Sequence, residues 1–226
     1  MKFSDMNWME VEEYLKKDDR VLLVLGATEQ HGYLSVTTDV EIPLALAEAA
    51  SNQSGVAMAP PLSFGISPYF LAYPGTISLR VSTFLDAVED MLRSLYGQGF
   101  RRFVILNGHG GNDAAKSRII ELENELVGMQ VAWYSWWIAP SVMRVAASHG
   151  LQSYHAAWIE AFDFIHRKNM PAGGKPAIQP KTLLGAKEVK AVVGDGVYGG
   201  PYQADKAVMD EIFAAALADV LDLLNF

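Results

Sequence analysis

Six side chains in this sequence could bind a metal ion or move a proton. They are Glu29, His31, Asp39, His109, His155 and Glu160. Imidazole and carboxylate groups without a thiolate suit Zn²⁺, Mn²⁺ or Fe²⁺. A carboxylate shared by two ions commonly holds them ~3.5–4 Å apart and makes bound water largely hydroxide near neutral pH. This set of residue types therefore predicts a site for divalent metal.

Two of these residues, Glu29 and His109, follow predicted buried strands. Val21 to Leu25 is a short apolar run without a polar face, which is typical of a strand buried on both sides. Glu29 and His31, two positions apart in the loop that follows, lie on the same side of an extended backbone. His109 follows a second such run, Phe100 to Leu106. Because ligands bind at the carboxyl ends of parallel strands, we expect the two loops to face one site.

Each residue also has a simpler interpretation. Asp39 stands at the head of a predicted helix and could be only its N-cap. NGHGGN, residues 107–112, could be only a turn, since Asn-Gly and Gly-Gly are turn dipeptides. A single histidine in a loop more often makes a hydrogen bond than binds a metal ion. The metal interpretation is favoured because the polar residues follow separate buried strands at their carboxyl ends.

Strands and helices alternate along the chain, which predicts an α/β fold with a mainly parallel sheet. Two further strands are expected at 55–59 and 129–137. Helices are expected where apolar residues recur every three to four positions: 7–17, from 39 onward, 81–97, from 109 to about 126, 140–148, 156–167 and 203–224. Segments 62–79 and 168–202 are rich in Gly and Pro and are predicted to be loops, the first long enough to carry function. Without an internal repeat or linker, one domain is expected over 1–226.

The composition excludes several classes of function. A net charge of −8 argues against nucleic acid or an anionic membrane surface as partner. The absence of cysteine excludes disulfides, thiolate zinc sites and a cysteine nucleophile. The amino terminus lacks the apolar core of a signal peptide, and no apolar stretch is long enough to span a bilayer. These features predict a cytoplasmic protein.

Four stretches of the chain together resemble the creatininase (creatinine amidohydrolase) family, in its NGHGGN branch. They are GATEQHGYLSVTTD, YPGTISL, NGHGGN and YHAAWIE, in the family's order and at similar spacing between residues 21 and 164. The resemblance implies a three-layer α/β/α sandwich. It also implies a homo-oligomer, a hexamer in the family, with two divalent ions in each active site.

The resemblance further implies roles for individual residues. Glu29, Asp39 and His109 would bind one ion, while His31 and Asp39 would bind the second, so that Asp39 is the bridge. Two more residues would act in catalysis: His155 as acid and base, and Glu160 as a further ligand or site carboxylate. Substrate contacts are expected from Tyr73, Gly110, Gly111 and Trp158.

Three departures from the family pattern bear on the substrate. The loop HGYLSVTTD is one residue shorter than the usual HGPHLPLGTD and lacks its Pro-His pair. In creatininase itself the stretch that corresponds to NGHGGN resembles NGHYEN, with an acidic ligand where this chain has Gly111. Glu160 is therefore the candidate for the missing carboxylate. The usual Thr-Ser pair after that glutamate is Ala161-Phe162 here. These changes argue against creatinine as the substrate.

The resemblance predicts an amidohydrolase that cleaves a non-peptide C–N bond in a small cyclic amide or formamide, by a hydroxide bridging the ions. A phosphorylated substrate, as in the family's formamidopyrimidine-ribotide deformylase, would need a nearby cation. The candidates are Arg80, Arg101, Arg102 and Lys116. Two alternatives stay open: a short-peptide hydrolase like the mycofactocin-maturation member, and a non-catalytic protein that binds a metal or ligand.

Four tryptophans could form a wall of the pocket for a flat substrate. They are Trp133, Trp136, Trp137 and Trp158. Alternate aromatic residues on a strand more often lie in the core or at a subunit interface. Together with the Gly/Pro-rich segment that begins at Lys168, the aromatic strand makes a homo-oligomer the expected state.

Overall fold

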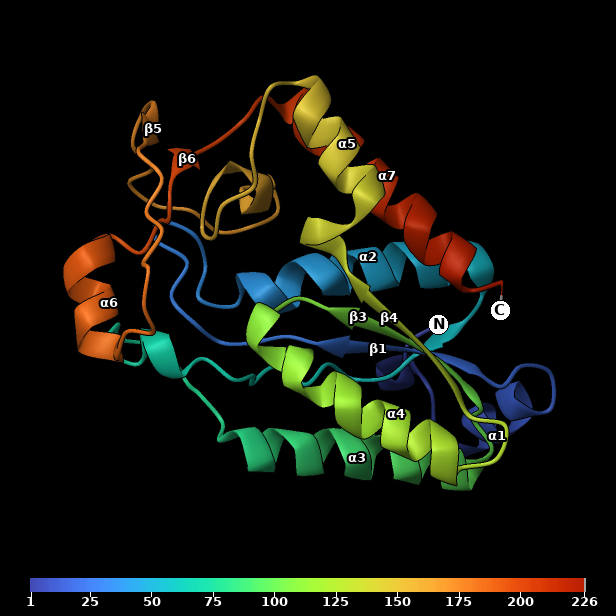
Figure 1. The fold of residues 1–226 in the computed structure, drawn as a ribbon. Helices are drawn as coiled ribbons and strands as arrows, with labels where there is room; N and C mark the ends of the chain where they lie inside the picture. Colours follow the sequence, from blue (N-terminus) through green and yellow to red (C-terminus); the bar gives the residue numbers. More distant parts are fainter. Residues whose placement is uncertain (226) are drawn as a thin grey trace.

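A four-stranded parallel sheet runs through the centre of the computed structural model, which describes residues 1–225 (Figure 1). The strands lie in the order β2 (Ala57–Met58), β1 (Arg20–Leu25), β3 (Arg102–Asn107) and β4 (Gln130–Ser135). The last residues of the three long strands are paired side by side, so these strands end level. The predicted parallel sheet is therefore confirmed, and its carboxyl edge can carry loops from neighbouring strands to one place.

Helices cover both faces of the sheet and make the three layers (Figure 1). The helices on one face are α2 (Thr38–Ser54), α5 (Pro140–Ser148) and α7 (Lys206–Leu223). Those on the other are α1 (Trp8–Leu15), α3 (Val81–Gln98) and α4 (Ala115–Glu125). Within residues 1–225, no helix combines the length and apolar character that crossing a membrane requires.

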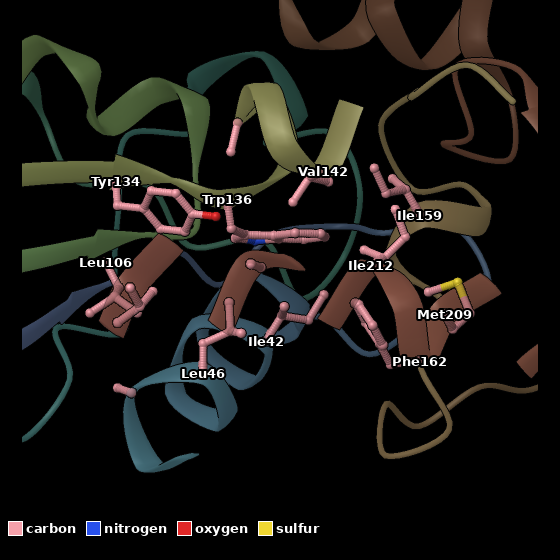
Figure 2. Packing of buried hydrophobic residues seen from close by; sticks show 14 of the residues in the cluster. Ile42, Leu46, Leu106, Tyr134, Trp136, Val142, Ile159, Phe162, Met209 and Ile212 are labelled. Atoms are coloured by element: carbon pink, nitrogen blue, oxygen red, sulfur yellow. The ribbon is translucent and has the colours of Figure 1, made fainter. Parts of the chain in front are cut away.

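Alternate residues of each strand enter opposite cores. Leu22 and Val24 of β1 belong to the cluster under α2, α5 and α7, whereas Val21 and Leu23 belong to the cluster under α3 and α4. This division follows from the two-residue period of a strand and explains the unbroken apolar run in the sequence. Figure 2 shows the first cluster, where Trp136 lies among side chains from the sheet and the helices. Two packed faces hold the carboxyl edge of the sheet in place.

The helix predicted over 156–167 is wrong. Only a 3-10 turn, Trp158–Glu160, forms there. Ala156 has a φ of +59°, which is outside the helical region, and its N–H donates to the Glu160 carboxylate over 2.7 Å. Because this local bond replaces a helical one, the chain turns back and places Glu160 beside the end of the sheet.

Segment 168–202, predicted to be a loop, contains regular structure. A short antiparallel pair forms between β5 (Gly174–Lys175) and β6 (Gly200–Pro201), and α6 (Ala186–Val193) lies between them in the sequence. The Glu188 side chain accepts the N–H of Gly185 over 2.6 Å at the start of α6. The helix packs on the 3-10 turn Pro68–Phe70, and together they flank the carboxyl edge of the sheet (Figure 1).

Two predicted element boundaries differ slightly from the structure, and both lie just after a strand. The strand predicted at 129–137 ends at Ser135, and residues Trp136–Ile138 form a 3-10 turn. After β3, a 3-10 turn at Gly110–Ala114 precedes α4. His109 therefore lies at the junction between strand and turn, where its side chain can face the end of β1.

Candidate metal centre

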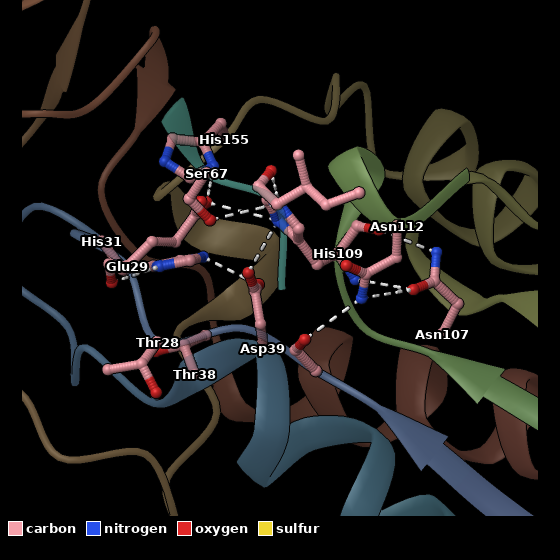
Figure 3. A network of polar contacts seen from close by, with 12 residues as sticks. Thr28, Glu29, His31, Thr38, Asp39, Ser67, Asn107, His109, Asn112 and His155 are labelled. Atoms are coloured by element: carbon pink, nitrogen blue, oxygen red, sulfur yellow. Dashed lines mark hydrogen bonds and ion pairs between the residues drawn. The ribbon is translucent and has the colours of Figure 1, made fainter. Parts of the chain in front are cut away.

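Five predicted ligands from three distant parts of the chain meet beyond the carboxyl ends of β1 and β3. Figure 3 shows four of them: Glu29, His31, Asp39 and His109. Nε2 of His31 lies 3.0 Å from Oδ1 of Asp39 and 3.6 Å from Oε1 of Glu160. Nδ1 of His109 lies 3.0 Å from Oδ2 of Asp39 and 3.5 Å from Oε1 of Glu29. Asp39 thus presents a different oxygen to each histidine.

These residues form two groups of three possible ligands. Glu29, Asp39 and His109 make one group, and His31, Asp39 and Glu160 make the other. In each group the ligand atoms lie within 4.8 Å of one another, and all five residues are buried. Asp39 belongs to both groups, so the geometry has the form of two cation sites that share one carboxylate. The shortened loop before Asp39 does not carry it away from the histidines.

Within residues 1–225, three buried polar atoms of this cluster have no hydrogen-bond partner apart from the contacts between Asp39 and the two histidines. They are Oε2 of Glu29, Nε2 of His31 and Oδ2 of Asp39. A buried polar atom without a partner costs free energy, about 1–3 kcal/mol, unless another group binds it. Two divalent cations would satisfy all three atoms, because each is a carboxylate oxygen or an imidazole nitrogen. The residues present therefore fit a pair of such ions.

Hydrogen bonds to backbone carbonyls fix which nitrogen of each histidine is free. Nε2 of His109 lies 2.8 Å from the carbonyl oxygen of Ile66, and Nδ1 of His31 lies 3.2 Å from that of Glu29. A carbonyl only accepts, so these nitrogens carry hydrogens. The opposite nitrogens, Nδ1 of His109 and Nε2 of His31, face Asp39 and are available to a metal ion. Carbonyl contacts of this kind orient metal-binding histidines.

Asparagine side chains and a glycine hold the His109 loop against β1. Nδ2 of Asn107 donates to the His109 carbonyl over 2.8 Å, and Nδ2 of Asn112 donates to the Gly26 carbonyl over 3.1 Å. A Cβ atom on Gly108 would lie only 1.9 Å from the Asp39 carbonyl oxygen. NGHGGN is therefore more than a turn: it lets the end of β3 pack directly on the first turn of α2.

Asp39 does not cap α2. The N-cap position belongs to Thr37, and Asp39 lies within the first helical turn with its side chain toward His31 and His109. The N-cap interpretation of Asp39 is thus wrong. The helix amino terminus favours negative charge there, which adds to the attraction of the two histidines.

Burial and mutual charge shift the pKa values of the cluster strongly. Burial lowers the pKa of His109, but the carboxylates of Glu29 and Asp39 outweigh it and raise the value to about 9. Burial likewise opposes protonation of His31, yet Asp39 and Glu160 raise its pKa well above 6.5. Burial raises the pKa of Glu29 to about 7. For Asp39 the two histidines overcome burial and lower the pKa. The protein without metal therefore holds protons that a cation must displace.

His155 lies beside this cluster, on the wall of a cavity. Its ring stacks on Phe70 at 4.8 Å between centroids, and its Nδ1 lies 3.8 Å from Oε1 of Glu29 (Figure 3). Burial, together with the nearby charge of His31, lowers the pKa of His155 well below 6.5. Its imidazole is therefore neutral at neutral pH, unlike the two histidines that face Asp39.

The cavity has a volume of about 310 Å³ and opens directly on the metal-ligand cluster. Besides Glu29, Asp39, His109, His155 and Glu160, its lining residues are Tyr69, Phe70, Gly108, Gly110, Trp137, Ser153, Tyr154 and Tyr198. Most of the wall away from the ligands is aromatic. A cavity of this size, lined by aromatic rings and a few convergent polar groups, suits a small molecule.

Three of the four residues expected to contact substrate do not line this cavity. Trp158 is fully buried in the core and donates from Nε1 to the Gln152 carbonyl. Tyr73 packs with Phe70 beneath α6, and Gly111 lies against the Ile66 carbonyl. Gly110 does reach the cavity. Sequence periodicity could not distinguish these positions, because Tyr73 lies in a loop and the other three lie in short 3-10 turns, whose paths are set by tertiary packing.

Several residues that form the wall were not predicted from the sequence. Tyr69 and Phe70 lie in segment 62–79, where the unusual length and the motif YPGTISL indicated function but neither residue was singled out. Tyr198 follows α6 and reaches the cavity because its N–H binds the His155 carbonyl over 3.1 Å. The signal that was available is the concentration of tyrosines in two Gly/Pro-rich segments, which are unusual places for bulky aromatic residues.

Several curated proteins match this chain in sequence. A 3-dehydro-scyllo-inosose hydrolase from Thermotoga maritima is 31% identical over 110 residues, which are 48% of this chain and 35% of that protein. A creatinine amidohydrolase from Pseudomonas putida is 33% identical over 116 residues, 48% of this chain and 45% of the relative. The alignments thus span less than half the length of both relatives. A mycofactocin precursor peptide peptidase from Mycolicibacterium smegmatis is 28% identical over 220 residues, 91% of this chain and 84% of the peptidase.

Solved creatininase structures share the fold. One described as creatininase Mn superposes with a TM-score of 0.80 at 24% identity, over 98% of this chain and 96% of that one. A mutant creatininase of the Zn-Zn type gives a TM-score of 0.80 at 22% identity, over 98% and 95% of the two chains. The family model for creatininase, described as creatinine amidohydrolase, matches residues 4–224. With nearly the whole chain covered by that model, this protein belongs to the creatininase family.

Proposed function

We propose that this protein is a divalent-metal-dependent amidohydrolase that cleaves a C–N bond in a small cyclic amide or formamide. The observation that carries the proposal is the pair of ligand groups that share Asp39 and open on one aromatic-lined cavity. Membership of a family of amidohydrolases supports the same reaction class.

Two ions would be held by the five buried ligands. Glu29 and His109 would bind one ion, His31 and Glu160 the other, and Asp39 both. Mn²⁺ and Zn²⁺ are the first candidates, since related structures are described with them. A bound pair of such ions makes water nucleophilic near neutral pH and stabilises negative charge on a carbonyl oxygen.

The chain's own residues would orient the substrate and handle protons. Ala156 fixes one oxygen of Glu160 through its N–H, which leaves the other oxygen toward His31. Gly110 begins a 3-10 turn at the cavity, where a first-turn N–H is free to bind a carbonyl oxygen. His155 presents its ring to the same space and would contact the group that leaves.

The wall favours a flat substrate without a phosphate. Rings of Tyr69, Phe70, Trp137, Tyr154 and Tyr198 surround the cavity, and no lysine or arginine within residues 1–225 lines it. Aromatic faces pack well against planar amide rings. Three of the five buried ligands are carboxylates, which carry negative charge and do not attract an anion. Apart from the metal ions, an anionic group would find no permanent positive charge to bind in this cavity.

The four cations considered for a phosphate are placed elsewhere. Arg101 stacks on Tyr96 and donates to the Phe100 carbonyl, and Arg102 binds Asp19, both at the amino end of β3. Two others remain, Arg80 before α3 and Lys116 in α4, and neither lines the cavity. This placement argues against a ribotide substrate.

A substrate screen of the metal-loaded protein tests the proposal. Creatinine, hydantoins, dihydropyrimidines, N-formyl compounds and short peptides would be compared at one metal concentration, with an Asp39→Ala variant as blank. Turnover of a cyclic amide or formamide that the variant lacks is the expected result. A full complement of metal without turnover of any amide would instead favour a non-catalytic binding protein.

Peptide hydrolysis is the second candidate. The mycofactocin precursor peptide peptidase aligns over 91% of this chain, far more than the other two relatives. A peptidase of this kind would need a cavity that admits the end of a peptide substrate rather than a separate cyclic molecule. Faster turnover of short peptides than of any cyclic amide in the same screen would favour it.

The homo-oligomer expected from the sequence stays a prediction. Trp136, part of the aromatic strand that suggested a subunit contact, is buried within its own core. Trp137 lines the cavity instead. Light scattering of the purified protein would measure the number of subunits directly.

A further inference from the structure

Gln30, which lies between two of the proposed ligands, is buried and binds His155. Its Nε2 lies 3.0 Å from Nε2 of His155 and donates to the Gly196 carbonyl over 3.1 Å. Its Oε1 accepts the N–H of Gly32 over 3.1 Å. The Gln30 backbone N–H donates to the Thr76 hydroxyl over 3.0 Å. Both ends of the side-chain amide are therefore bound.

The two backbone partners leave the Gln30 amide only one orientation. The Gly32 N–H can only donate, so it must face the amide oxygen, and the Gly196 carbonyl can only accept, so it must face the NH₂ group. A Cβ atom on Gly196, which has a φ of +94°, would lie 1.7 Å from Oε1 of Gln30. Glycine at this position thus allows the close approach that holds the amide.

The amide orientation determines where His155 carries its hydrogen. The NH₂ group of Gln30 faces Nε2 of His155, so this nitrogen must accept with its lone pair. A neutral imidazole with a free lone pair on Nε2 carries its hydrogen on Nδ1. The stacking of His155 on Phe70 and its edge contact with Tyr198 fix the ring plane, but they do not distinguish the two nitrogens.

The choice of nitrogen matters because His155 is close enough to bind metal. One of its nitrogens lies within 4.8 Å of ligand atoms of Glu29 and His31, which makes a third possible ligand group. Nδ1 is the nitrogen that faces Glu29, at 3.8 Å. A nitrogen must give up its hydrogen before it can bind a metal ion, since ligation needs the lone pair; in neutral His155 that hydrogen would have to move to Nε2, which faces the NH₂ group of Gln30.

We propose that Gln30 is a positioning residue that holds His155 in the Nδ1–H form, which keeps this histidine off the metal ions and directs an N–H group toward the cavity. His155 then acts on a bound substrate as a hydrogen-bond donor. This refines the acid and base role expected for it from the family resemblance. Only the part that concerns substrate rests on the proposed function, because the form of the imidazole is a property of the protein itself.

The Gln30→Glu variant tests the proposal with almost no change of shape. One carboxylate oxygen would keep the Gly32 N–H, and the other would replace the NH₂ group and accept a hydrogen from Nε2 of His155. ¹⁵N NMR of histidine-labelled protein reports which nitrogen of each imidazole is protonated, and a His155→Phe variant identifies the signals of that residue among the five histidines. We expect hydrogen on Nδ1 alone in the wild type, and hydrogen on Nε2 in Gln30→Glu. Hydrogen on Nε2 in the wild type, or unchanged signals in Gln30→Glu, would overturn the proposal.

Two further variants control for charge and folding. Gln53→Glu makes the same charge change at an exposed position of α2 and should leave the His155 signals unchanged. Gln30→Met removes the donor without adding charge, so it covers the case in which Gln30→Glu does not fold. We expect both forms of His155 to be populated in folded Gln30→Met, whereas retention of the Nδ1–H form alone would contradict the proposal.

Activity separates this inference from the proposed function. On a substrate found in the screen, we expect kcat of Gln30→Met to fall about tenfold or more with an unchanged metal content and little change in KM. If the wild type hydrolyses nothing, the proposed function fails, while the NMR result still decides the role of Gln30. If activity is present and kcat of Gln30→Met equals that of the wild type, the N–H of His155 does not act on the substrate.

Discussion

Nδ1 of His109 lies 3.0 Å from Oδ2 of Asp39, and this contact joins the end of β3 to the first turn of α2. The other oxygen of Asp39 meets His31, which follows β1. One carboxylate thus connects three segments at the carboxyl edge of the sheet. If two metal ions share that carboxylate, three kinds of change should affect metal binding or stability in different ways. They are the loss of a ligand that serves only one ion, a change of pH, and a displacement of the backbone around Asp39.

Glu29 and Glu160 should each serve one ion. Glu29→Gln should weaken binding of the ion near His109, and Glu160→Gln should weaken binding of the ion near His31, by about tenfold or more in each case. Metal titration followed by elemental analysis after dialysis should leave close to one ion in each variant. Loss of both ions to the same degree in the two variants would show that the groups are not separate. Glu121→Gln, at an exposed position of α4, is the matched control.

Metal binding should release protons. Because the carboxylates raise the pKa of His109 to about 9 and that of His31 well above 6.5, both rings are protonated at pH 7 in the metal-free protein. Each ion must displace the proton of one histidine, and Glu29, whose pKa is about 7, is also partly protonated, so about two to three protons should leave per protein and metal affinity should rise with pH up to about 9. Calorimetric titration in buffers of different ionisation enthalpy measures this number. Affinity that falls or stays constant between pH 6 and 8 would contradict the charge states assigned to the two histidines.

Gly108→Ala should damage the site from the backbone. A methyl group there would lie 1.9 Å from the Asp39 carbonyl oxygen and push α2 away from β3, so we expect a loss of stability above about 2 kcal/mol and weaker metal binding. Gly97→Ala is the control, since a Cβ atom at Gly97 meets nothing within 4 Å and should stabilise α3 by about 0.5–1 kcal/mol. Urea unfolding of both variants checks the contrast. Equal stability of the two would refute the close approach.

Trp137 and Trp158 should behave differently although both were candidates for the pocket wall. Trp158 is fully buried, so Trp158→Ala should cost about 3–5 kcal/mol of stability. Trp137 lines the cavity, so Trp137→Ala should mainly raise KM, by about tenfold for the loss of one aromatic contact. Unfolding curves and kinetics on the same preparations measure the two effects. A larger KM effect from a folded Trp158 variant would reverse the assignment.

The sheet and most of the ligand positions could be predicted from the sequence because local signals agree there with the fold. The run from Val21 to Leu25 is apolar at every position, and only a strand covered on both faces needs that pattern. Glu29, His31 and His109 come directly after such runs, so the rule that sites form at carboxyl ends of parallel strands was enough to bring them together.

The regions that could not be predicted are those where a single tertiary contact determines the path of the backbone. Ala156 and its neighbours have the composition of a helix, but the bond from the Ala156 N–H to Glu160 turns the chain instead. In α6 the signals were present and weak: Gly185 and Gly194 flank the helix, and Val189 and Val193 are four positions apart and buried. The aromatic residues of the wall come from four separate segments, and the meeting of these segments leaves no periodic signal in the sequence.

A crystal structure of the protein loaded with Mn²⁺, with anomalous diffraction data, tests the shared role of Asp39 most directly. We predict two anomalous peaks ~3.5–4 Å apart, one beside Glu29 and His109 and one beside His31 and Glu160, with an oxygen of Asp39 bound to each. A single peak, or two peaks of which only one contacts Asp39, would contradict that shared role.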